Sequence, residues 1–162
     1  MNLITRIISC ASLTTASLIL NTLVSAPDKN MLGEQIAEYK GKIIGQRVLD
    51  VEGPTMETRA SASGKIKGTE VNVNITYIAR PTSTGVLRGE GKGVIMAGAS
   101  EMATETGTGT GVFTSSGVKW RGAQFYRTSS TGRLASLNNV VGVFEAEVDT
   151  EGNFSLKTWE WK

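Results

Sequence analysis

Few side chains in this sequence could carry acid-base or nucleophilic chemistry. The 162 residues include no histidine and one cysteine, Cys10, which excludes Ser-His-Asp and Cys-His nucleophiles and every common zinc ligand set except carboxylates. Carboxylates, tyrosines and basic side chains remain. If the protein is an enzyme, the predicted catalytic groups are Tyr126, Arg121 and a carboxylate that faces an interior beside Tyr126, namely Glu105. No metal site and no cofactor are predicted.

The carboxylates in the predicted strands have a simpler interpretation as solvent-exposed charges. Glu101, Glu105, Glu145 and Glu147 all lie in predicted strands, and the last two alternate with apolar residues. Because charged side chains usually stay exposed, a solvated position is the default expectation for each of the four. Only an inward-facing carboxylate would indicate acid-base work.

A set of aromatic residues predicts a small-molecule site instead. If their segments close into a barrel, one inner face carries Tyr77, Trp120, Tyr126 and Phe144. These side chains have apolar bodies, and the tyrosines and tryptophan add polar tips that can orient a small organic molecule. The alternative is that they only fill the core, since small barrels are normally packed solid.

Two glycine runs, "GEGKGV" at 89–94 and "GTGTGV" at 107–112, invite a phosphate-binding interpretation. Neither run matches a dinucleotide or P-loop pattern, and no helical segment follows either one. Each run places its glycines on one face of a strand, where glycine relieves crowding, so both are predicted to be bending points. An even pairing sum would put both rows on one face, as a bare patch that an aromatic side chain or a partner must cover. An odd sum would separate the rows.

The elements that position these residues are predicted to be strands. Apolar and polar residues alternate in runs such as "VNVNITYIA" at 71–79, and glycine, proline, serine and aspartate separate the runs. About eight strands are expected, near 42–50, 55–63, 66–79, 86–96, 101–113, 117–128, 139–149 and 153–161. The prediction is an all-β domain over 41–162, a single antiparallel β-barrel whose lumen is packed or holds one small ligand.

Three segments at the margins complete the barrel. Residues 27–40 are predicted to be a leading arm, with a short amphipathic helix at 32–39 as the alternative. The connection "SSTGRLASLNN" at 129–139, with Leu134 and Leu137 three apart, predicts a helical turn that closes one mouth. Trp159 and Trp161 share a face of the final strand, which either closes the sheet or offers a surface for a homo-oligomer.

The first 26 residues have the pattern of a signal peptide. Arg6 is the single charge before Asp28, and "VSA" at 24–26 offers a cleavage site. The expected location is therefore secreted or periplasmic. The alternative is an untranslated extension before Met31, with a cytoplasmic protein. Because serine, threonine and asparagine interrupt the apolar run, no stable membrane span is predicted.

The charge balance argues against one class of partner. Lys and Arg total 17 against 15 Asp and Glu, a net charge of +2 that is spread along the chain. Nucleic-acid binding depends on clustered positive charge, so no nucleic-acid partner is predicted.

The segments "LRGEGKGVIM" at 87–96 and "RGAQFYRTSSTGRLASLNNVVGVFEAEVDTEGN" at 121–153 resemble a family of small uncharacterised, mainly bacterial proteins of about this length. The resemblance covers most of the chain from Met31 onward. The glycine-punctuated strands are also similar in pattern to allene oxide cyclase and dirigent barrels. That resemblance implies an allene oxide cyclase-like or lipocalin-like barrel whose lumen binds an apolar substrate and steers cyclisation or coupling without a cofactor. No catalytic residue of those families matches a position here.

Together these patterns predict a non-catalytic barrel that binds a small apolar ligand or a protein partner. Two alternatives stay open. One is a cofactor-independent cyclase or isomerase that acts in the lumen, and the other is a structural oligomerisation module.

Overall fold

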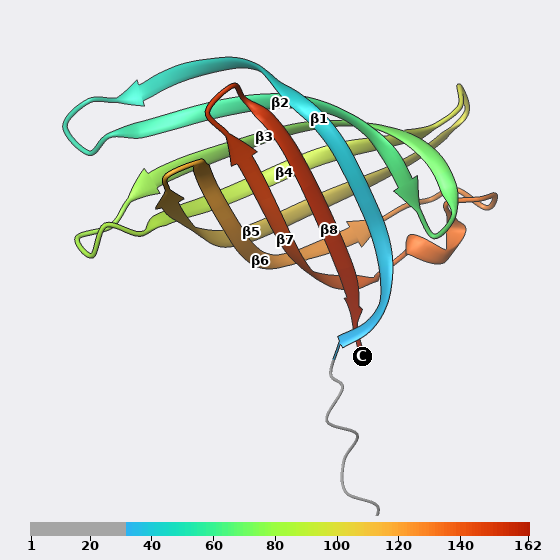
Figure 1. Cartoon of the computed structure of the whole chain (residues 1–162). Helices are drawn as coiled ribbons and strands as arrows, with labels where there is room; N and C mark the ends of the chain where they lie inside the picture. The colour runs from blue at the N-terminus through green and yellow to red at the C-terminus, as the bar shows by residue number, and fades with distance from the viewer. Residues whose placement is uncertain (1–31) are drawn as a thin grey trace, which may run out of the picture.

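The computed structural model describes residues 32–162 as one closed barrel of eight antiparallel strands (Figure 1). This confirms the predicted fold class. The strands are β1 (Leu32–Asp50), β2 (Thr55–Ile66), β3 (Thr69–Pro81), β4 (Leu87–Ala97), β5 (Glu101–Thr114), β6 (Gly117–Arg127), β7 (Val141–Asp149) and β8 (Asn153–Trp161), with a 3-10 helix η1 (Ala135–Leu137) before β7. The predicted signal segment at 1–26 lies outside the described residues.

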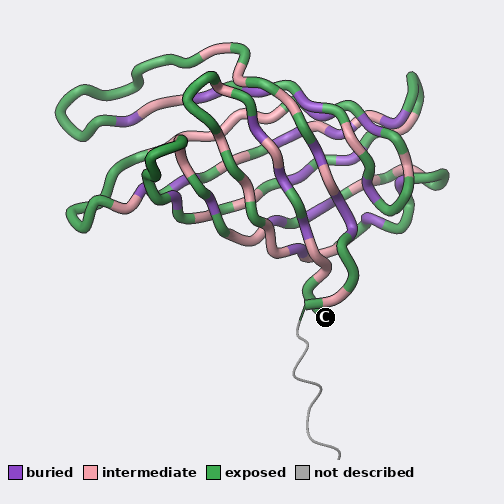
Figure 2. Tube along the Cα trace, in the orientation of Figure 1, coloured by how far each residue is buried: buried purple, intermediate pink, exposed green. Residues whose placement is uncertain are grey.

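The period of two in the sequence becomes the inside and outside of the barrel. In β3, Val71 and Val73 are buried while Asn72 and Asn74 are exposed. Figure 2 shows the same alternation of buried and exposed positions along the other strands. Because successive side chains of a strand point to opposite faces, one residue in two reaches the lumen.

β1 begins at Leu32, earlier than the predicted strand near 42–50. The leading arm predicted at 27–40 is therefore wrong from Leu32 onward, and so is its alternative, a helix at 32–39, because these residues are part of the barrel wall. A shift in the β1–β8 register between Gln35 and Ala37 explains the error. A bulge of this kind turns two consecutive residues, Ile36 and Ala37, toward the core, which breaks the alternation that marks a strand.

The final strand closes the barrel. β8 pairs with β7 on one side and with β1 on the other, so both of its edges have strand partners. By contrast, β1 pairs with β8 only as far as Lys42, while its pairing with β2 continues to Asp50. The β1–β2 hairpin therefore extends beyond the barrel (Figure 1).

Within residues 32–162 there is no helix with the length and apolar character needed to cross a bilayer.

The connection between β6 and β7 closes one mouth of the barrel, as predicted. Leu134 and Leu137 are each only 1% exposed and pack into the core with the side chains of the strands. Glu101 at the start of β5 fixes this segment. Its carboxylate accepts hydrogen bonds from Arg133 Nε at 2.8 Å, from the Leu134 backbone N–H at 3.0 Å and from Ser130 Oγ at 3.0 Å. These bonds, with that from Arg133 first, lower the pKa of Glu101 to about 2.

Replacing this carboxylate is expected to loosen the closed mouth. In a Glu101→Gln variant, the charge-assisted bonds to Arg133 and Leu134 are lost, so amide hydrogen exchange across residues 128–140 should accelerate by about tenfold or more. Hydrogen exchange read by mass spectrometry measures this. Glu145→Gln, which removes an exposed ion pair on the outer wall, is the control. Unchanged exchange at 128–140 in Glu101→Gln would contradict the role of Glu101.

Candidate ligand-binding site

The β4–β5 register decides the orientation of the two glycine rows. Gly89 pairs with Gly109 and Gly91 pairs with Gly107, an even pairing sum. Both rows therefore face the lumen, because residues directly opposite each other in a sheet share a face. The wall of the barrel has no side chains along this strip.

Aromatic side chains from β6 and β7 occupy part of the space above the strip. A methyl group added to Gly89 or Gly111 would lie 2.7 Å or 2.9 Å from the ring of Trp120, and one added to Gly109 would lie 3.1 Å from Phe144. The glycine rows thus make room for rings. The predicted role as bending points is incomplete, since close backbone approach occurs only at some positions. At Gly109, for example, an added methyl group would lie 2.7 Å from the carbonyl oxygen of Arg121.

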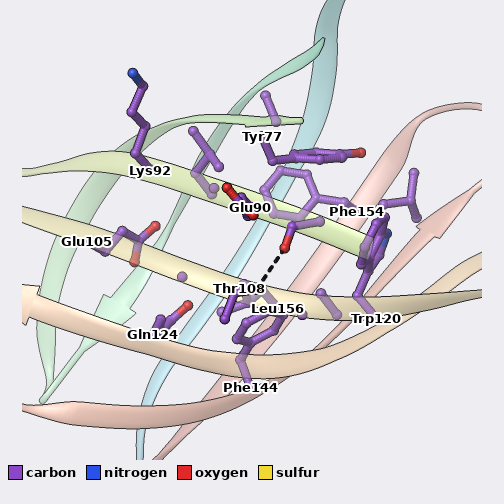
Figure 3. Close-up of a pocket in the computed structure, with 18 of the residues that line it drawn as sticks. Tyr77, Glu90, Lys92, Glu105, Thr108, Trp120, Gln124, Phe144, Phe154 and Leu156 are labelled. Carbon is purple, nitrogen blue, oxygen red and sulfur yellow. Dashed lines mark hydrogen bonds between the residues drawn. The ribbon is translucent and has the colours of Figure 1, made fainter. Parts of the chain in front are cut away.

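A half-open cavity of about 110 Å³ remains inside the barrel (Figure 3). Its aromatic walls are Tyr77, Trp120, Phe144 and Phe154, with aliphatic side chains between them. The ring of Tyr77 meets that of Trp120 edge to face, with centroids 5.7 Å apart and planes at 68°. The cavity runs from the β7–β8 turn inward to Glu105, toward the end of the barrel that η1 closes.

Of the four aromatic residues predicted to bind a ligand, the cavity brings together Tyr77, Trp120 and Phe144. Tyr126 lies deeper, fully buried, and does not line the cavity. The core-filling alternative therefore describes Tyr126, while the other three form a wall. Sequence analysis missed Phe154, although Phe154 and Leu156 alternate with polar residues in the final strand as the other inward residues do.

Glu105 is the carboxylate that faces the interior. Its residue is only 6% exposed, and within the described chain its Oε2 has no hydrogen-bond partner. Burial away from water raises the pKa of Glu105 to about 7. Figure 3 shows Glu105 and Gln124 together at one end of the cavity, with the aromatic rings toward the other end. The default expectation of a solvated position fails here, whereas Glu145 and Glu147 do lie on the exposed face.

A polar cluster lies under this end of the cavity. Gln124 donates through Nε2 to the Tyr126 hydroxyl and, at 2.9 Å, to Thr158 Oγ1. The hydroxyl of Tyr39 is buried and has no partner among the described residues. Burial, followed by the nearby negative charge of Glu105, raises the pKa of both Tyr39 and Tyr126, so both phenols are neutral near pH 7.

The predicted catalytic trio does not assemble. Glu105 and Tyr126 are cross-strand partners on the inner face. Arg121 lies on the outer face, where its side chain is 81% exposed and its Nε pairs with Glu145 at 3.2 Å. The physical reason is the period of two, since Arg121 and Tyr126 are five positions apart in one strand and must face opposite ways.

Comparison with known proteins supports the fold. A protein with unknown function from Clostridium acetobutylicum has 12% identity and a TM-score of 0.68 over 80% of this chain and 98% of its own. A conserved protein of unknown function from Rhodopseudomonas palustris has 9% identity and a TM-score of 0.66, over 78% and 95%. No protein-family model and no curated protein matches the chain. This chain is therefore similar in fold to bacterial proteins of unknown function, and the likeness to allene oxide cyclase and dirigent barrels stays a prediction.

Proposed function

We propose that this barrel binds a small, largely apolar organic molecule in its lumen. The observation that carries the proposal is the cavity of about 110 Å³ between aromatic walls. One water molecule requires a cavity of roughly 10–15 Å³. The volume of this cavity is therefore larger than a few waters need, and it suits one small ring. Apolar walls with a few converging polar groups are typical of ligand sites.

The paired glycine rows support this function because glycine inside a strand lowers the stability of the fold. Glycine inside a strand destabilises a protein by roughly 0.5–1 kcal/mol relative to alanine at each position. At Gly91 a methyl group would meet Cβ of Tyr77 at 3.3 Å, so alanine there requires only a shift of a few tenths of an ångström in that neighbour. No backbone atom lies close enough to exclude a side chain at this position. Residues that are unfavourable for their secondary structure occur chiefly at functional sites, and here the glycines leave room in the lumen.

Binding without chemistry is favoured over the cyclase or isomerase alternative by the positions of the candidate catalytic groups. Arg121 is outside the barrel, and the Tyr126 hydroxyl is hydrogen-bonded to Gln124 below the cavity. Of the predicted trio only Glu105 reaches the cavity. A single carboxyl supplies one polar contact, which is sufficient to orient a ligand.

Titration with toluene tests the proposal. In NMR spectra of the full chain, toluene should shift the resonances of cavity residues such as Trp120. The variant Gly91→Val adds a side chain to the glycine strip and should lower the affinity for toluene by about tenfold or more. Thr106→Val, an exposed position on the outer face of β5, is the matched control and should bind as the parent does. Absence of any shift with toluene and also with its amine analogue benzylamine, or equal toluene binding by both variants, would refute the proposal.

A further inference from the structure

The buried carboxylate of Glu105 has no counter-charge in the described chain. Every lysine and arginine in residues 32–162 is exposed. Lys92 borders the cavity, but its side chain points away from it (Figure 3). A buried charge without a partner is costly, and proteins normally pair or neutralise such a group.

The elements packed around Glu105 supply no cation. β4 places Gly93 against it, so close that a methyl group there would lie 2.7 Å from Oε1. The titratable groups that face it are the phenols of Tyr39 from β1 and Tyr126 from β6, and both are neutral near pH 7. The amide of Gln124 on β6 already donates to Tyr126 and to Thr158 on β8. A positive charge beside Glu105 would have to come from outside the chain.

We infer that the ligand of this lumen carries a basic nitrogen, such as a primary amine, which ion-pairs with Glu105 while its apolar ring packs between Trp120 and Phe144. This inference rests on the proposed function and adds the chemical class of the ligand. Charge-assisted hydrogen bonds are the strong ones, and an ammonium group would satisfy the orphan Oε2. The aromatic walls suit the other end of the same ligand, because its ring can pack against the rings of Trp120 and Phe144.

The alternatives in ligand chemistry fit less well. An anionic ligand would be repelled by an ionised Glu105 in a medium of low dielectric constant. A neutral hydrocarbon would leave both Oε2 and the carboxyl proton without a partner. With a pKa of about 7, Glu105 can ionise near neutral pH at modest cost, so a cation that enters the cavity draws it fully into the charged form.

Benzylamine and toluene, which share a ring and differ in the amine, test the inference by calorimetric titration of the full chain. The parent protein should bind benzylamine about tenfold or more tightly than toluene. Glu105→Gln should lose this preference and still bind toluene. Glu147→Gln, which removes the same charge from the outer wall, is the matched control and should keep the preference.

The outcomes separate the two claims. If toluene binds and benzylamine has no advantage, or if Glu105→Gln keeps the advantage, the basic-nitrogen inference is wrong and the proposed function stands. If neither probe binds, the proposed function itself is wrong. If the Glu105→Gln variant does not fold, the pH dependence of binding by the parent protein provides the test instead. Benzylamine affinity should rise from about pH 5 to about pH 8 as Glu105 ionises, and toluene affinity should not rise; parallel profiles would overturn the inference.

Discussion

Replacing Gly122 with alanine is expected to lower the free energy of unfolding by about 3 kcal/mol or more. A methyl group at this position would lie 2.1 Å from the carbonyl oxygen of Thr108 and 2.7 Å from the Cα of Gly109. Both atoms belong to the backbone of β5, which cannot move away without breaking its pairing with β6. Urea unfolding followed by circular dichroism measures the loss.

Gly91→Ala is the matched control for this prediction. Its methyl group would meet Cβ of Tyr77 at 3.3 Å and next the carbonyl oxygen of Thr76 at 3.7 Å. The strand should accept it after a shift of a few tenths of an ångström at Tyr77, so the change in the free energy of unfolding should stay within about 1 kcal/mol. Equal losses in Gly91→Ala and Gly122→Ala would show that close backbone approach does not distinguish the two sites.

Stability is expected to fall by about 3 kcal/mol from about pH 5 to about pH 8. The pKa of Glu105 is about 7 in the folded barrel, against 4.5 for an ordinary glutamate. Between these values the folded state holds a proton that the unfolded state has released, so rising pH favours unfolding. This contribution is complete below the ordinary pKa and is lost as pH rises through about 7. Urea unfolding at a series of pH values measures it.

The variant Glu105→Gln should remove most of this slope, because glutamine has the same shape and does not titrate. Other perturbed carboxylates act outside the window, since the pKa of Glu101 is about 2 and hydrogen bonds from Asn153 hold that of Asp149 below its usual range. The buried tyrosines have raised pKa values and stay neutral. Glu147→Gln is the control. An unchanged slope in Glu105→Gln would mean that the carboxyl is not buried as described.

Most of the fold could be predicted because alternation and turn residues are local signals. The expected strand near 153–161 and the turn of helix within 129–139 agree with β8 and η1. The start of β1 was missed because its bulge puts Ile36 and Ala37 side by side in the core. A bulge is set by pairing with a distant strand, here β8, and no local pattern marks it.

The candidate site was predictable in its residue types but not in its assembly. The aromatic residues Tyr77, Trp120 and Phe144 follow from periodicity, and the misplacement of Arg121 could have been avoided by counting its distance from Tyr126 along one strand. The register of the glycine rows depends on how β4 and β5 meet, which the sequence left undecided. The absence of a cation near Glu105 depends on where every lysine and arginine of residues 32–162 lies in the folded barrel. No local sequence pattern could predict it.

Where Gly91 faces Gly107, the lumen and the outer surface are separated by a single layer of peptide groups. Thr108 and Lys92 border the cavity through this layer, although their side chains are on the outer face. A ligand bound in the lumen as we propose would therefore lie against peptide groups whose other side faces the solvent. If that ligand is charged, its field should reach the outer surface of this strip through one layer of peptide groups, without any movement of the strands.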